Sequence, residues 1–266
     1  MGLAVNLLLL KHLFSPSVYK SFITGLLLFL GFAAGAFAQG SGDREFIWGL
    51  NWNTNGGIIG GASIRSSRPL GDKEKWQHFW GVEIVEVKHP KENPLLGLDG
   101  DVFILGKTNY LFVVRPEYGR EYTIFRKAPE AGVQVSGVIG AGPSFGLLVP
   151  YYISYDYTQY RNGVQVTPTD VRVERYEPLG KHSEFERIRG SAGFLTGFSE
   201  TDVNLGAHLR TALSFEYGRY QENIVGVETG FLFEGFTRKL VMLPAAPENY
   251  QLFTSVYLTV YWGRRN

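Results

Sequence analysis

The sequence contains no cysteine, which excludes disulfides, thiolate metal sites, a cysteine nucleophile and a lipidated N-terminal cysteine. An excess of either charge is also missing: 26 basic and 25 acidic residues give a net charge of +1, so no basic cluster of the kind that binds nucleic acid is indicated. The five histidines show no metal-ligand spacing, and no motif predicts a cofactor. After residue 38, no apolar run reaches the roughly 18 residues that predict a membrane-spanning helix.

The first 38 residues differ in character from the rest of the chain. Lys11 and Lys20 precede the apolar run FITGLLLFLGFAAGAFA (residues 22–38), which ends in Ala36-Phe37-Ala38. A basic leader, a short apolar core and small residues at the end are typical of a secretory signal peptide. A single transmembrane anchor is the alternative, because this segment is close to the roughly 20 residues needed to span a bilayer. We expect a signal peptide over residues 1–38 and one exported domain over residues 39–266.

Glycine and aromatic residues are abundant, with 33 glycines and 15% Phe, Trp and Tyr. In VNLGAHLRTALSFEYG (residues 203–218), apolar and polar side chains alternate with a period of two, which predicts a β-strand. This strand is far longer than the usual five or six residues. Similar stretches recur along the chain and predict eight strands, over residues 45–54, 57–67, 76–88, 109–119, 132–152, 203–218, 223–238 and 250–263.

The connections between these strands tend to alternate in length, with two exceptions: the first outer turn, at Asn55-Gly56-Gly57, is tight, and the second inner connection is not. Three of them are short or moderate, including a piece around Arg120 to Glu130, while the others include a region of roughly 45 residues from Ile153 to Asp202. Short turns at one end, long loops at the other and an even strand count predict an all-β, antiparallel up-and-down transmembrane β-barrel. The sequence around Asn162-Gly163 predicts a hairpin within the long loop, and ten wall strands are the alternative. Helical spacing within residues 183–198 predicts a short helix there.

The polar faces of the strands carry charges that a soluble core could not hold. A charge facing lipid near the midplane costs roughly 2–4 kcal/mol for Arg or Lys, so we expect the apolar faces to meet lipid and the polar faces to fill the lumen. An ion pair between Arg210 and Glu228 is predicted. Aromatic residues near strand ends predict interfacial girdles, formed by Trp48, Trp52, Trp76, Trp80, Tyr217, Tyr261 and Trp262. The predicted lumen network, structural or pore-lining, consists of Arg65, Glu83, Arg115, Glu117, His208, Arg210, Glu216, Glu228 and Glu234.

No catalytic constellation is evident in the sequence. His208 and Ser214 share a polar face, but six residues of strand separate them by about 20 Å, so they cannot share a proton. A pairing of His208 with a Ser or Glu of a neighbouring strand stays open, and with it a lipid-modifying enzyme. We expect a protein without catalytic, metal or cofactor-binding residues.

Several segments carry a resemblance to a known family. GAGPSFGLLVPYY before a long loop, HLRTALSFEYG followed by VGVETGFLFEGF, and the end VYLTVYWGRRN resemble a family of small, uncharacterised outer-membrane β-barrel proteins of Bacteroidetes-type bacteria. The resemblance covers the mature chain and implies a location in the Gram-negative outer membrane, not an activity. Many barrels end on an aromatic residue that the assembly machinery recognises; here Trp262 is followed by four more residues.

The expected function is that of a non-enzymatic outer-membrane barrel with a structural or surface-interaction role through its outer loops. The alternatives are a narrow, porin-like pore or a carrier for a small ligand, and a soluble periplasmic barrel whose apolar faces point inward. The expected partners are outer-membrane lipid and, during biogenesis, the barrel assembly machinery. The extracellular partner is left undefined, and no nucleic acid is expected.

Overall fold

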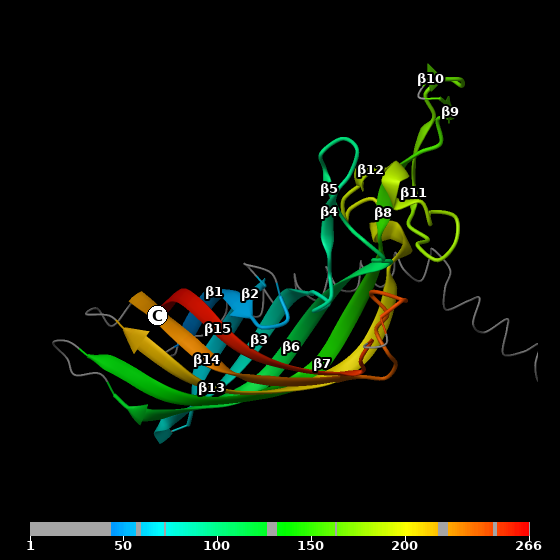
Figure 1. Cartoon of the computed structure of the whole chain (residues 1–266). Coiled ribbons are helices and arrows are strands. Elements are labelled where there is room, and N and C mark those ends of the chain that lie inside the picture. The colour runs from blue at the N-terminus through cyan, green and yellow to red at the C-terminus, as the bar shows by residue number, and fades with distance from the viewer. Residues whose placement is uncertain are drawn as a thin grey trace, which may run out of the picture. The chain divides into compact units, whose positions relative to one another are not determined.

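The protein folds into a closed antiparallel barrel of eight strands in a computed structural model, which describes residues 44–56, 60–71, 73–126, 132–162, 164–217, 223–246 and 249–265 (Figure 1). The barrel order is β1-β15-β14-β13-β7-β6-β3-β2, and β1 pairs with both β2 and β15, which closes the wall. The predicted eight-stranded, all-β architecture is confirmed, and the ten-stranded alternative is wrong. The wall strands are β1 (Glu45–Asn53), β2 (Gly61–Leu70), β3 (Lys73–Val87), β6 (Asn109–Phe125), β7 (Val133–Pro150), β13 (Asp202–Tyr217), β14 (Asn223–Phe236) and β15 (Leu252–Arg265).

The wall has the reverse polarity of a soluble barrel. Along β13, the apolar Leu205, Leu209 and Leu213 are 55%, 43% and 45% exposed, whereas His208 and Arg210 between them are 4% and 2% exposed. Successive side chains of a strand point to opposite faces, so the leucines lie outside and the charges inside. A soluble barrel with apolar faces inward does not fit this arrangement.

Connections of unequal length define the two ends of the barrel. At the inner end, short connections join β2 to β3, β6 to β7 and β13 to β14. At the outer end lie residues 88–108, 151–201 and 237–251, together with the short connection of residues 54–60 between β1 and β2. The inner connection expected around Arg120 to Glu130 is shorter than predicted, because β6 continues to Phe125 and β7 begins at Val133. The strand signal weakens there because the polar Arg120 and Glu121 interrupt the apolar run.

Aromatic pairs line the outside of the barrel towards its inner end. Trp48 packs on Trp262 with ring centroids 4.9 Å apart, and Trp76 and Trp80 pack on Tyr122 and Tyr118 at 4.8 and 4.6 Å.

Tyr261 differs from the predicted girdle. It is 5% exposed and faces the lumen, where its hydroxyl lies 2.7 Å from the Ser214 Oγ. Its position near a strand end suggested that it belongs to the girdle. However, Tyr257 and Thr259 are buried, and Tyr261 follows them at every second position of the strand, so it lies on the same inward face.

Short strands form a separate sheet beyond the outer end (Figure 1). β8 (Tyr152–Asp156) lies between β11 (Val171–Arg175) and β12 (Ile188–Ser191), and the tip is the hairpin β9 (Tyr160–Arg161) and β10 (Val164–Gln165). The hairpin predicted here is confirmed, and Asn162 takes the left-handed conformation (φ 50°) that its turn needs. A second hairpin, β4 (Pro94–Leu96) and β5 (Val102–Ile104), lies beside β12.

The short helix predicted within residues 183–198 is wrong. Its place is taken by single 3₁₀ turns, η1 (Phe185–Arg187) and η2 (Phe198–Glu200), with the strand β12 between them. Pairing with the edge of β8 provides hydrogen-bond partners for the backbone of β12. The glycines of this segment also lower its helix propensity. Within the described residues, no helix is long and apolar enough to cross a membrane.

Candidate functional site in the barrel interior

All nine residues of the predicted lumen network lie on inward faces of wall strands. Their exposed fractions range from 1% for Glu83 and Glu228 to 8% for Arg65. An isolated buried ion costs several kcal/mol, so the partners of each charge decide what the lumen can do.

The strongest pair joins β6 to β14. The Arg115 Nε and Nη2 donate to the two carboxylate oxygens of Glu234 at 2.8 and 2.7 Å, and both side chains are at most 5% exposed. Such a two-pronged geometry gives the strongest charge-assisted hydrogen bonds that a guanidinium makes. The Arg115 Nη1 also donates to Glu83 on β3 at 3.1 Å, which links three strands across the lumen.

Arg210 on β13 lies among three carboxylates. Its Nη2 donates to Glu83 at 2.7 Å, its Nε lies 3.1 Å from Glu117, and its Nη1 lies 3.7 Å from Glu228. The expected contact with Glu228 is therefore present, but it is the longest of the three. The guanidinium also stacks over the Tyr257 ring, 4.8 Å from its centroid.

Glu228 has Arg65 as its main partner. Two guanidinium nitrogens of Arg65 lie 3.0 and 2.7 Å from the two Glu228 oxygens, and the Tyr257 hydroxyl donates to Glu228 at 2.6 Å. The other side of Arg65 packs on the fully buried Phe79 ring at 4.5 Å. Apolar and charged groups thus fill the same cross-section of the lumen.

Glu216 lies apart from this cluster, at the inner end of the barrel. Its carboxylate lies 3.1 Å from the Arg265 Nη2, which also lies 2.7 Å from Glu45. Arg265 and Glu45 were not predicted as lumen residues, because both stand at strand ends, where alternation alone does not separate lumen from solvent. Asn51 was not predicted either, although it lies on the polar face of the first predicted strand; its amide donates to Glu83 at 2.9 Å.

A serine, a histidine and a glutamate do come together across strands. The Ser144 Oγ on β7 lies 3.1 Å from the His208 Nδ1, and the His208 Nε2 lies 3.7 Å from Glu117. However, the Ser144 hydroxyl donates its hydrogen to Glu234 at 2.6 Å, so the imidazole is the donor in the Ser144 contact. A nucleophilic serine needs the opposite arrangement, with histidine accepting its proton. With Ser144 fully buried, no substrate reaches it.

An apolar cap closes the outer mouth above the ion pairs. Leu240 and Met242, from the connection between β14 and β15, are 0% and 2% exposed and pack on inward side chains such as Val85, Leu111 and Phe236. Asn249 fixes this connection: it accepts from the Met242 amide at 3.0 Å and donates to the carbonyls of Leu243 and Ala246, both at 2.8 Å. The apolar run Leu240 to Leu243 is visible in the sequence, but it has no regular period from which a cap could have been predicted.

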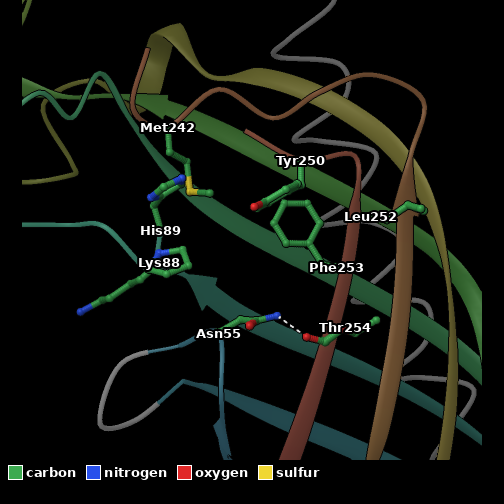
Figure 2. Close-up of a pocket in the computed structure, with 9 residues that line it drawn as sticks. Asn55, Lys88, His89, Met242, Tyr250, Leu252, Phe253 and Thr254 are labelled. Atoms are coloured by element: carbon green, nitrogen blue, oxygen red, sulfur yellow. Dashed lines mark hydrogen bonds between the residues drawn. The ribbon is translucent and has the colours of Figure 1, made fainter. Parts of the chain in front are cut away.

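A small cavity lies beside the cap, with a volume of about 280 Å³ (Figure 2). It is lined by Met242, Tyr250 and Phe253 on one side and by Lys88 and His89 on the other. The His89 Nδ1 accepts from the Lys91 amide at 3.1 Å, and the Lys88 Nζ lies 3.9 Å from Glu86. Because ligand pockets usually measure about 300–1,000 Å³, this cavity is slightly smaller than a usual ligand pocket.

Metal ligation has no support in the part of the chain that the structure describes: it contains no group of three or more His, Asp or Glu side chains placed to hold a metal ion.

Comparisons with known proteins find structural likeness only. No family model matches the chain, and no curated protein matches it. Among solved structures, Ail, the attachment invasion locus protein of Yersinia pestis, is similar with a TM-score of 0.37 and 8% identity, covering 85% of this chain and 100% of that chain. The structure of Ail in complex with the heparin analogue sucrose octasulfate has a TM-score of 0.38 and 9% identity, and the match covers 85% of this chain and 100% of that chain. Neisserial surface protein A (NspA) gives a TM-score of 0.32 and 8% identity over 84% of this chain and 95% of its own.

With these TM-scores and identities, no ligand, partner or orientation of Ail or NspA can be transferred to this chain. The barrel assignment rests on the strand pairing of the chain itself.

Proposed function

We propose that this protein is an integral outer-membrane β-barrel with a sealed lumen and no enzymatic activity, which acts as a structural or surface-interacting protein through its outer loops. The reversed polarity of the wall carries this proposal. Outward residues such as Phe231, Phe233 and Leu209 are 43–56% exposed, while Glu234 and Arg210 on the other face are buried. Solvating such a wall in water would expose a continuous apolar surface far larger than soluble proteins tolerate, whereas a bilayer covers it.

Two layers of side chains inside the barrel favour a sealed lumen and argue against a narrow pore. The ion pairs of Arg65, Arg115 and Arg210 cross the middle of the barrel, and the apolar cap around Leu240 and Met242 lies above them. An eight-stranded barrel is just wide enough to be filled by side chains. A conducting pore would need a continuous water-filled path, whereas the described charges of the central network contact one another across the lumen.

The outer sheet supports a role at the surface. β11 pairs with β8 along one edge, and no described strand pairs with its other edge. Val173 and Val164 are 54% and 66% exposed on this sheet and its tip. Exposed edge strands and apolar residues on long loops are features with which surface proteins bind partners.

The proposed route to the membrane begins with export. Residues 1–38, the predicted signal peptide, lie outside the described residues, and their cleavage would release the barrel domain to the assembly machinery of a Gram-negative outer membrane. Membership of the Bacteroidetes-type barrel family stays a prediction.

Fractionation of expressing cells tests this proposal. The protein should be recovered from the outer membrane only with detergent, and should migrate differently on gels before and after boiling, as folded barrels do. Purified protein in planar bilayers should give no conductance steps. Recovery in the soluble periplasmic fraction would refute the membrane location, while regular conductance steps would support the pore.

A further inference from the structure

One segment of the outer connection between β7 and β13 (residues 151–201) folds back over the outside of the wall. We call residues 192–200 the brim. Phe194 of the brim packs with its ring centroid 5.5 Å from that of Phe112 and 6.4 Å from that of Tyr110. Both partners lie on the outward face of β6, because the alternating Leu111, Val113 and Arg115 point into the lumen. The brim therefore covers the face of the wall that would meet lipid.

The brim lies directly against the backbone of the wall. A Cβ atom on Gly197 would lie 2.3 Å from the carbonyl oxygen of Pro150, at the end of β7, so only glycine allows this approach. Further bonds fix the segment: the Thr196 hydroxyl donates to the Ala192 carbonyl at 2.8 Å, and the Tyr152 hydroxyl donates to Glu200 at 2.7 Å. The backbone of the brim is thus held against the wall.

Much of the surface of the apolar side chains of the brim stays exposed. Leu195 is 73% exposed, Phe194 44% and Phe198 39%. Three large apolar residues within five positions form a local patch of the kind that soluble surfaces avoid. Because they stand on the outside of the barrel, they cannot contribute to the capped lumen.

The height of the brim matches the outer margin of the apolar wall. Phe112 pairs in register with Leu147, which pairs with Val203, and the exposed Leu205 follows only two residues further into the wall. Aromatic residues of membrane barrels gather at such margins. The inner margin carries the Trp and Tyr pairs of the wall, and on the β6–β7 side the outer margin carries Tyr110, Phe112 and Phe194.

We propose that the brim is a lipid anchor, with Phe194, Leu195 and Phe198 inserted among the acyl chains at the outer face of the bilayer. The anchor would fix the depth of the β6–β7 side and hold the base of the outer sheet against the membrane surface. This inference rests on the proposed membrane location and adds a second lipid contact, made by a loop instead of a strand.

Single cysteines test the anchor cleanly because the chain has none of its own. Leu195→Cys, labelled with an environment-sensitive fluorophore, is compared in phosphatidylcholine vesicles with Leu209→Cys in the wall and Val164→Cys at the hairpin tip. All three side chains are exposed on the protein, so the substitutions leave the packing intact. Folding of each variant is verified by its heat-dependent migration.

The Leu195 label should show blue-shifted emission, quenching by lipids brominated near the headgroup and protection from aqueous iodide. The Leu209 label should be quenched by lipids brominated deeper in the chain, and the Val164 label by iodide alone. If Leu195 behaves like Val164 while Leu209 reports lipid, the anchor is refuted and the barrel location stands. If Leu209 and Leu195 both report water, the membrane location fails as well.

Discussion

Removing one partner of the strongest buried ion pair should destabilise the barrel far more than removing both. In Arg115→Met, Glu83 keeps Arg210 at 2.7 Å and Asn51 at 2.9 Å, whereas Glu234 loses both guanidinium bonds and keeps only the Ser144 hydroxyl. Leaving one buried charge unpaired in this way costs about 3–5 kcal/mol of unfolding free energy. In the double variant Arg115→Met/Glu234→Leu no orphaned carboxylate remains, and apolar replacement of a buried pair is about neutral or stabilising by about 1–4 kcal/mol.

Urea unfolding in vesicles, followed by the fluorescence of the five tryptophans, measures these differences. A matched control is Arg172→Met in β11 of the outer sheet. Arg172 also makes a two-pronged contact, with Asp170 at 2.9 and 2.7 Å, but its side chain is 58% exposed, so its loss should cost at most about 1 kcal/mol. If Arg115→Met costs no more than Arg172→Met, or if the double variant is as unstable as the single one, the lumen charges are hydrated and the reasoning fails.

Three further predictions concern packing, the cap and the outer sheet. Gly142→Ala should lower stability by about 1–3 kcal/mol, because its Cβ would lie 2.0 Å from the Pro116 carbonyl oxygen, whereas Gly137→Ala, with its nearest neighbour at 3.8 Å, should be tolerated; the urea midpoints of the two variants decide this. Asn249→Ala should speed hydrogen exchange across residues 239–246, since three hydrogen bonds of the cap are lost, while Gln251→Ala should not. Burial would raise the pKa of Asp156, but hydrogen bonds from Thr158 and Arg189 outweigh it and lower this pKa below the ordinary 3.8. Its stabilisation is therefore present above that value and lost as the pH falls through the lower pKa of the folded state. Proteolysis of the outer sheet should become faster in the wild type as the pH falls, with a weaker pH dependence in Asp156→Asn; equal pH dependence would contradict the assignment.

Period-two alternation was sufficient to predict the barrel, because a wall strand separates two environments along its whole length. In β13, the alternation of Leu205, Leu209 and Leu213 with His208 and Arg210 predicted both the strand and the faces that the structure shows. The signal is robust since a slip of one residue would turn every charge outward.

The period-two alternation could not predict which charged side chains pair with one another inside the barrel. Arg210 was predicted to pair with Glu228, but strand stagger brings Glu83 and Glu117 closer. Glu216 shares the inward face with the network but lies too far along the strand to join it, and pairs with Arg265. Alternation predicts which face a side chain occupies, but it does not predict the shear that decides which neighbour it meets.

The outer connections were the least predictable part of the chain. Residues 185–195 have apolar spacing that suits a helix, yet Ile188 to Ser191 form a strand that pairs with β8. The edge of β8 offers hydrogen-bond partners for this backbone, and the glycines of the segment disfavour a helix. The cap was missed for a related reason. Its residues carry no regular period, so only the folded barrel shows that Leu240 and Met242 turn into the mouth.

The most direct test of the account is the environment of Leu209, at the middle of β13, in outer-membrane vesicles. A spin label at Leu209→Cys should collide freely with oxygen, which concentrates in lipid, and only rarely with a water-soluble nickel complex. The reversed polarity of the wall predicts this result, because Leu209 points outward between the inward His208 and Arg210. High accessibility to the nickel complex, with low accessibility to oxygen, would place this face in water and contradict the proposed membrane barrel.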